Sequence, residues 1–231
     1  MTSQAAATSI AAPPRPGPFA LRRLHSLSGM VPVGAFLVFH LFENLKVGIS
    51  PEAYQASIRH LWEIAPRGVF YAVELLVVLA PILFHGLYGL WIWHTGESNT
   101  AQYPYLRNWL YTAQRWSGLV VLAYIGFHVW QLRVFPDGQL ALARPDAASL
   151  TTFDQVARAV TPIGSTILYL VGGIAAAFHL GNGLFGFASS WGLAVGRKAQ
   201  QRVELAGWGL FVILSLAVIY TVFTVRSPGA V

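Results

Sequence analysis

Five long apolar stretches, separated by shorter polar segments, dominate the sequence. They cover approximately Leu27–Leu45, Val69–His94, Leu110–Phe135, Pro162–Val195 and Leu205–Val225. Each approaches or exceeds the ~20 residues that an α-helix needs to cross a bilayer. The pattern therefore predicts an all-α fold, an integral membrane bundle of five transmembrane helices.

Polar and proline-containing segments refine this layout. Residues 1–18 are small, polar or proline-rich and contain no long apolar core, so we expect a disordered tail followed by a single five-helix domain over residues 19–231. Ser50-Pro51-Glu52 is typical of a helix start and predicts a short surface helix, and Thr152–Arg158 predicts a second one. Pro81 is expected to kink the second long helix because it removes a backbone donor.

The composition agrees with a membrane protein. Of the 231 residues, 55% are hydrophobic and only 10% are charged, whereas a soluble domain carries roughly 25% charged residues. The sequence contains no cysteine, which excludes disulfides, thiolate zinc sites, cysteine-ligated iron–sulfur clusters and c-type haem attachment. The net charge of +6 comes without long Lys/Arg runs, so nothing points to a nucleic-acid partner.

The basic residues predict the orientation. An odd number of crossings places the two termini on opposite sides, and the short segments on the N-terminal side are rich in arginine and lysine. By the positive-inside rule, the N-terminus and the 1–18 tail are then cytoplasmic and the C-terminus is outside. The residues on the cytoplasmic side are Arg15, Arg22, Arg23, Arg107, Arg115, Arg197, Lys198 and Arg202.

Four histidines lie inside apolar stretches, one on each of the first four helices: His40, His85, His128 and His179. Ionisable residues within a span are rare and usually functional. The distance of each from its span ends places His40 and His128 at an outer level, and His85 and His179 at an inner level. We call these the outer pair and the inner pair. They predict two bis-imidazole sites between facing helices, as cofactor sites in bundle cores are built.

Helical phase suggests what each site holds. Two residues that are eleven positions apart differ by only 20° around the axis of an α-helix. The residues eleven positions before the four histidines therefore share a helix face with them; they are Gly29, Glu74, Ser117 and Leu168. Gly29 and Ser117 are expected to leave room for a flat macrocycle at the inner level, and Gly172 at the outer level. Zinc prefers four ligands, or three and a water, whereas two imidazoles suit haem b, whose porphyrin supplies four nitrogens.

Further polar residues are candidates for contacts with a cofactor or substrate. Glu74 is a lone acid within a span and could exchange protons with a quinone; the alternative is an interfacial carboxylate paired near Arg67. Haem propionates at the inner face require cationic and hydrogen-bonding partners. The candidates there are His25, Ser26, Gln114 and Arg115.

A glycine motif at residues 181–186 matches G-x-G-x-x-G. It lies within an apolar helix pattern, and no predicted strand precedes it. A dinucleotide site is therefore rejected, and the glycines are expected to allow close approach of a ring or a helix.

Seven motifs stand in order along the chain and resemble a known family. They are R-R-L-H-S-L-S-G (22–29), H-L-F-E-N (40–44), F-H-G-L-Y-G (84–89), Q-Y-P-Y-L-R-N-W (102–109), Q-R-W-S-G (114–118), F-H-V-W (127–130) and F-H-L-G-N-G-L (178–184). From about Phe19 to the end of the fifth helix, the chain resembles the two-haem cytochrome b membrane anchor of succinate:quinone oxidoreductases. More narrowly, it resembles the single-chain, five-helix class often paired with menaquinone.

The resemblance implies roles for the histidines and partners for the chain. His40 and His128 would be axial ligands of an outer haem b, and His85 and His179 of an inner haem b. An iron–sulfur subunit and a flavoprotein subunit would dock on the cytoplasmic side. Electrons would pass from the iron–sulfur subunit through the inner haem and the outer haem to a quinone, which in this class is often menaquinone. The location implied is the bacterial cytoplasmic membrane, with several passes.

Two other readings of the histidines stay open from the residues alone. One is a dihaem cytochrome b of a different oxidoreductase, of the hydrogenase or formate dehydrogenase type. The other is a haem-free transporter or proton channel that uses its intramembrane histidines, which predicts a colourless protein.

Overall fold

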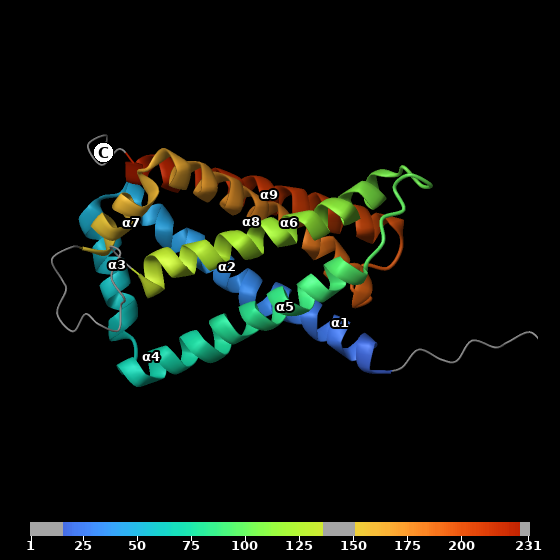
Figure 1. The fold of residues 1–231 in the computed structure, drawn as a ribbon, viewed down its shortest axis with the longest axis horizontal. Helices are drawn as coiled ribbons and strands as arrows, with labels where there is room; N and C mark the ends of the chain where they lie inside the picture. The colour runs from blue at the N-terminus through green and yellow to red at the C-terminus, as the bar shows by residue number, and fades with distance from the viewer. Residues whose placement is uncertain (1–15, 136–150, 227–231) are drawn as a thin grey trace, which may run out of the picture.

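The computed structural model describes residues 16–135 and 151–226, which form a bundle of long antiparallel helices (Figure 1). Five helical segments within these ranges are long and apolar enough to cross a membrane. The all-α membrane fold predicted from the hydrophobic pattern is thus confirmed. The segments are Phe19–Gly48, Arg67–Thr95, Leu106–Val134, Ile163–Ser190 and Arg197–Arg226.

The first three crossing segments combine α-helices with shorter helical turns of other kinds. The first joins α1 (Pro16–Ser28), η1 (Gly29–Val33), α2 (Gly34–Asn44) and η2 (Leu45–Gly48). The second joins α4 (Arg67–Val73), η3 (Glu74–Leu79) and α5 (Ala80–Thr95), and the third joins α6 (Leu106–Val129) and η4 (Trp130–Val134). The fourth and fifth are the single helices α8 (Ile163–Ser190) and α9 (Arg197–Arg226).

Three of these turns are π-helical, and two of them accompany prolines. Pro32 lies inside η1, and η3 ends at Leu79, just before Pro81. Proline lacks the N–H that an α-helix uses, and a π turn shifts the local pairing from four residues to five. A π turn therefore lies on the N-terminal side of Pro81, and the kink expected there stays a prediction.

Two short helices lie outside the crossing segments, as predicted. Helix α3 (Pro51–Glu63) lies across one end of the bundle in Figure 1. Its N-cap is Ser50, whose Oγ accepts a hydrogen bond from the Ala53 N–H at 3.0 Å. Helix α7 (Thr152–Val160) begins with a capping box in which Thr151 and Asp154 exchange hydrogen bonds.

The tightest helix pairing is between α8 and α9. Gly181 and Gly207 face each other so closely that a Cβ on Gly181 would lie 2.5 Å from the Gly207 carbonyl oxygen. A Cβ on Gly173 would likewise meet Val218 at 2.6 Å. Small residues allow membrane helices to approach closely. Within the glycine motif at 181–186, in the C-terminal third of α8, Gly181 therefore serves helix packing, whereas a Cβ on Gly186 would meet no atom within 4 Å.

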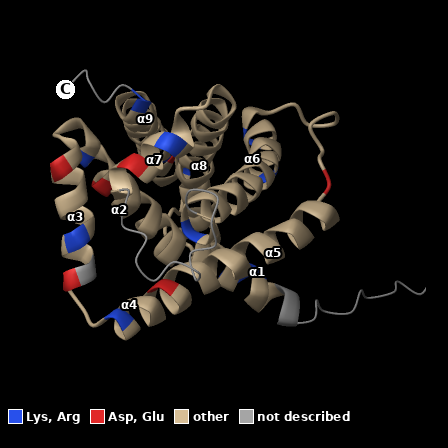
Figure 2. Ribbon diagram, turned by 60° about the vertical axis from the view of Figure 1, so that its left-hand side comes forward, with Lys and Arg blue, Asp and Glu red and all other residues tan. Residues whose placement is uncertain are grey.

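The ends of the chain and the charges fit a membrane-spanning bundle. Helix α1 begins at one end of the bundle and α9 finishes at the other (Figure 1), as five crossings require. Helix α5 has no charged residue along its length (Figure 2). Residues 1–15 of the predicted tail lie outside the described ranges, and α1 begins at Pro16, ahead of the predicted boundary at Phe19.

Candidate functional site

The four intramembrane histidines meet in the two pairs predicted from their depth. His85 on α5 and His179 on α8 have ring centroids 6.1 Å apart, with their ring planes at 86°. His40 on α2 and His128 on α6 have ring centroids 5.8 Å apart, with their planes at 80°. Each pair therefore joins two helices that are not consecutive in the sequence.

The inner pair is held by hydrogen bonds to its Nδ1 atoms. The Nδ1 of His85 lies 2.9 Å from the His25 carbonyl oxygen, and the Nδ1 of His179 lies 3.1 Å from the Gln114 carbonyl oxygen. A carbonyl oxygen can only accept, so each Nδ1 carries the proton. The lone pair of each ring is consequently on Nε2, which is the arrangement that metal-ligating histidines adopt.

The outer pair is surrounded by aromatic rings. His128 packs against Tyr124 and Tyr169, each with a centroid distance of 5.7 Å, and His40 stacks on Phe36 at 5.4 Å. The Nδ1 of His128 is buried and has no hydrogen-bond partner within the described residues. This ring is therefore positioned by packing, whereas the rings of the inner pair are positioned by hydrogen bonds.

The donor sets fit haem better than a bare metal ion. With metal–nitrogen bonds of about 2.0 Å, as for zinc, two imidazole centres on opposite sides of one metal lie about 6 Å apart. Within the described residues, no group of three or more His, Asp or Glu side chains could hold a metal ion. Two imidazoles per site match a metal whose other four ligands belong to a macrocycle.

The packing around the histidines also suits a cofactor between helices. All four rings are only half-buried. No residue in the most apolar stretch of the second or third crossing segment is buried, against 39% and 28% in the fourth and fifth. The second and third segments carry His85 and His128, so the helices that pack least against protein present one imidazole to each pair.

Glycines give the histidine rings their places. A Cβ on Gly29 would overlap the His85 ring, and a Cβ on Gly118 would lie 3.0 Å from Cε1 of His179. Gly29 was expected to make room for a macrocycle. In the structure, the space that its lack of a side chain leaves is occupied by the imidazole of His85. The expectation for Gly172 is wrong, because the Tyr124 ring fills the space beside it.

The residues predicted to contact haem propionates have different surroundings. His25 stacks on His85 with centroids 4.0 Å apart and planes within 5°, so it belongs to the inner pair's immediate environment. Ser26 Oγ accepts a hydrogen bond from Trp191 at 2.9 Å. The Arg115 guanidinium donates to the carbonyls of Trp93 and Gly96, which caps the end of α5. Propionate contacts for these residues stay predictions.

Gln114 lies directly against the inner pair. Its side-chain Nε2 donates to the His179 carbonyl oxygen at 2.9 Å, and its Oε1 accepts from Asn182 at 2.8 Å. Ser117, one turn further along α6, lies 3.1 Å from the Nδ1 of His179. Ser117 thus faces the inner pair, as its phase predicted. Asn182 was not identified from the sequence, although a polar residue three positions after a predicted ligand in an apolar helix is a usable signal.

Glu74 is engaged in an ion pair between two π turns. Its two carboxylate oxygens accept hydrogen bonds from Nε and Nη2 of Arg133, each at 2.9 Å. Glu74 begins η3 and Arg133 lies in η4, so the pair connects the second and third crossing segments. The Glu74 side chain is 25% exposed and the Arg133 side chain is 45% exposed. The sequence suggested Arg67 as the partner of Glu74. The partner in the structure is Arg133, the next basic residue after His128, which was not identified from the sequence.

A second polar cluster lies where α2 meets α3. Glu43 accepts hydrogen bonds from Lys46 at 2.8 Å and from Ser57, and its side chain is 10% exposed. Beside it, Asn44 donates to the His40 carbonyl oxygen at 2.7 Å. Burial, and then the charge of Glu43, raise the pKa of Tyr54 on α3 to about 12. This cluster holds α3 over the end of α2 that carries His40.

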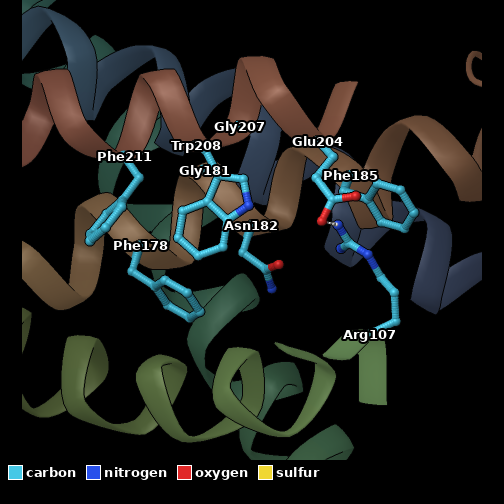
Figure 3. Close-up of a pocket in the computed structure, with 9 residues that line it drawn as sticks. All are labelled: Arg107, Phe178, Gly181, Asn182, Phe185, Glu204, Gly207, Trp208 and Phe211. Atoms are coloured by element: carbon cyan, nitrogen blue, oxygen red, sulfur yellow. Dashed lines mark ion pairs between the residues drawn. The ribbon is translucent and has the colours of Figure 1, made fainter. Parts of the chain in front are cut away.

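A small cavity lies between α6, α8 and α9 (Figure 3). Its volume of about 10 Å³ is room for one water molecule, which excludes a quinone headgroup. Arg107 and Glu204 form an ion pair at this cavity, and the Arg107 guanidinium lies 3.6 Å from the centre of the Phe185 ring. The remaining lining residues are Phe178, Gly181, Asn182, Gly207, Trp208 and Phe211.

Comparison with known proteins agrees with this arrangement. No family model matches the chain. The chain is 32% identical over 205 residues to the succinate dehydrogenase cytochrome b558 subunit of Bacillus subtilis (strain 168). The alignment covers 89% of this chain and 96% of the relative. By this similarity, the chain belongs to the family of succinate dehydrogenase cytochrome b subunits.

Proposed function

We propose that this chain is the membrane-anchor cytochrome b of a succinate:quinone oxidoreductase and binds two b haems. The observation that carries the proposal is the meeting of four intramembrane imidazoles in two pairs, with centroid distances of 6.1 and 5.8 Å. His85 and His179 would hold one haem, and His40 and His128 the other. When bound, the two haems supply one-electron transfer across the bilayer, from the inner to the outer level.

The chain's own residues fix the ligands and shield them. The inner imidazoles expose Nε2 because Nδ1 is committed to backbone carbonyls. The outer imidazoles pack against Phe36, Tyr124 and Tyr169. Fixed ligand orientation and a low-polarity surrounding are the means by which proteins set haem potentials.

Quinone chemistry is assigned to the outer level, near Glu74. Reduction of a quinone takes up two electrons and two protons, and a carboxylate at the edge of the apolar layer is suited to relay protons from water to the quinone oxygens. Arg133 holds both oxygens of Glu74, which orients the carboxylate between the second and third crossing segments. The resemblance favours menaquinone as the acceptor.

Succinate oxidation belongs to partner subunits. The chain has no cysteine to hold an iron–sulfur cluster, and its G-x-G-x-x-G motif lies within the transmembrane helix α8. A flavoprotein and an iron–sulfur subunit would dock at the end of the bundle where α1 begins. Arg22 and Arg23 mark this end, and they pack over Trp91 and Trp191 at 5.7 and 4.9 Å. In this proposal the N-terminal end lies in the cytoplasm of a bacterium, as the positive-inside rule favours.

Purification of the intact complex through a tag on this chain tests the proposal. We expect flavoprotein and iron–sulfur subunits to copurify, and succinate to reduce a b-type absorption that a menaquinone analogue reoxidises. Reduction by hydrogen or formate, but not succinate, would move the chain to a different dihaem oxidoreductase. A colourless complex would support a transporter instead. Either result contradicts the proposed function.

A further inference from the structure

A network of half-buried amide groups ties α6 to α8 beside the inner pair. Asn182 Nδ2 donates to Gln114 Oε1 at 2.8 Å and to the Leu110 carbonyl oxygen at 3.2 Å. Gln114 Nε2 then donates to the His179 carbonyl oxygen at 2.9 Å. In return, Nδ1 of His179 donates to the Gln114 carbonyl oxygen at 3.1 Å. The two helices therefore exchange hydrogen bonds in both directions at the level of His179.

We propose that Asn182 and Gln114 are positioning residues for His179, which fix the orientation and protonated nitrogen of this one axial ligand. The proposal rests on the proposed function, because it takes His179 to be a haem ligand. Neither residue need touch the iron. Their effect is to hold α6 and α8 in the register that places the Gln114 carbonyl oxygen opposite Nδ1.

Both polar atoms of the Gln114 side-chain amide make hydrogen bonds, which supports this positioning role. Its Oε1 accepts from Asn182, and its Nε2 donates to His179. In an apolar layer, each unpaired amide group costs free energy, so the satisfied arrangement is strongly preferred over slipped registers. Figure 3 shows Asn182 extending from α8 toward the neighbouring α6.

Ser117 reinforces the same arrangement. Its Oγ donates to the Gln114 carbonyl oxygen at 3.0 Å and lies 3.1 Å from the Nδ1 of His179. The carbonyl oxygen of Gln114 thus receives two hydrogen bonds and cannot easily turn away from the imidazole. Hydrogen bonds from Nδ1–H raise the basicity of a metal-ligating histidine and fix its plane.

The outer pair has no comparable hydrogen-bond network within the described residues. The Nδ1 of His128 is buried without a partner, and His40 is tied only through its backbone carbonyl, to Asn44. Loss of the Asn182–Gln114 network should therefore alter one haem and leave the other unchanged. A role limited to general helix packing would disturb both haems together.

The test uses Asn182→Leu in the intact, purified complex. We expect the low-spin EPR signal of one of two haems to shift and its midpoint potential to move in the positive direction, because the imidazole loses basicity. Gln114→Leu should give the same change, and the double variant little more than either alone. The affected signal is identified as the one absent in His179→Ala.

Thr166→Val is the matched control. Thr166 is a buried residue at the other end of α8, and its hydroxyl donates to the Val160 carbonyl oxygen at 2.7 Å. This variant removes one buried hydrogen bond and should leave both haem signals unchanged. An Asn182→Leu complex whose two haems match the wild type overturns the proposal, as does an equal change in both. A wild-type complex without two haems refutes the proposed function itself.

Discussion

A single added methyl group at Gly29 should remove the inner haem. A Cβ there would overlap Cε1 of His85 and lie 2.5 Å from its Nδ1 and 3.0 Å from its Nε2. Ordinary contact between heavy atoms is about 3.5–4.0 Å, so the ring must move by about 1 Å or more. That movement stretches the 2.9 Å hydrogen bond from Nδ1 to the His25 carbonyl oxygen beyond the usual limit of about 3.2 Å.

The ring cannot retreat easily, because His25 stacks on it with centroids 4.0 Å apart. We therefore predict that Gly29→Ala lowers haem content from two to one per chain while the outer haem keeps its spectrum. The assay is haem quantified per polypeptide, together with a redox titration of the b absorption. Gly126→Ala is the control, since a Cβ there meets no atom within 4 Å and Gly126 lies on the opposite face of α6 from His128.

Retention of the outer haem distinguishes local displacement of His85 from general misfolding. A Gly29→Ala complex with two haems and an unchanged titration would refute the reasoning, because it would show that the His85 ring is not confined by this glycine. Loss of both haems in Gly29→Ala, with both retained in Gly126→Ala, would also contradict it. In that case the substitution would act on the whole bundle.

Three more outcomes are expected. Glu74→Gln keeps the shape of the side chain but removes its charge, so quinone turnover should fall severalfold at unchanged haem content; normal turnover would leave Glu74 a structural partner of Arg133. Gly207→Ala places a Cβ against the Gly181 carbonyl oxygen and should lower the melting temperature in detergent, with an overpacking cost of about 1–3 kcal/mol. Gly209→Ala, which meets no atom within 4 Å, should not. The raised pKa of Tyr54 means that the folded state favours the neutral phenol. The free energy of unfolding should therefore be unchanged below pH 10 and fall as the pH rises toward 12. In alkaline unfolding curves, Tyr54→Phe should show a smaller fall.

The sequence predicts the histidine pairs because depth in a membrane is readable from hydropathy. Alternating helix directions and the distance of each histidine from its span ends place His40 with His128 and His85 with His179. Both pairs are found. Phase arithmetic also works on α6, which is a regular helix, where Ser117 faces His179 as expected.

Phase arithmetic is less secure where the backbone leaves α-geometry. The π turn at Glu74–Leu79 lies between Glu74 and His85. Each π turn adds about one residue, or about 100° of rotation, to the helical count. Counting eleven residues therefore does not keep Glu74 on the face of His85. Arg133 also lies in a π turn, and this explains why the sequence did not identify it as the partner of Glu74.

Side chains that fill space are equally hard to predict from one sequence. Gly172 has the spacing of a cofactor cradle, but Tyr124 from α6 occupies the place beside it. Such contacts depend on the distance and rotation of a neighbouring helix, which hydropathy does not give. The polar network around Gln114 depends in the same way on the register of α6 against α8.

Haem content in four single-histidine variants is the most direct test of two bis-imidazole sites at two depths. The intact complex should contain two b haems per chain. His85→Ala and His179→Ala should each lose the same haem, and His40→Ala and His128→Ala should each lose the other, as identified by redox titration and EPR. A protein that stays folded but loses both haems in every variant, or loses them in different pairings, would contradict the two-site arrangement.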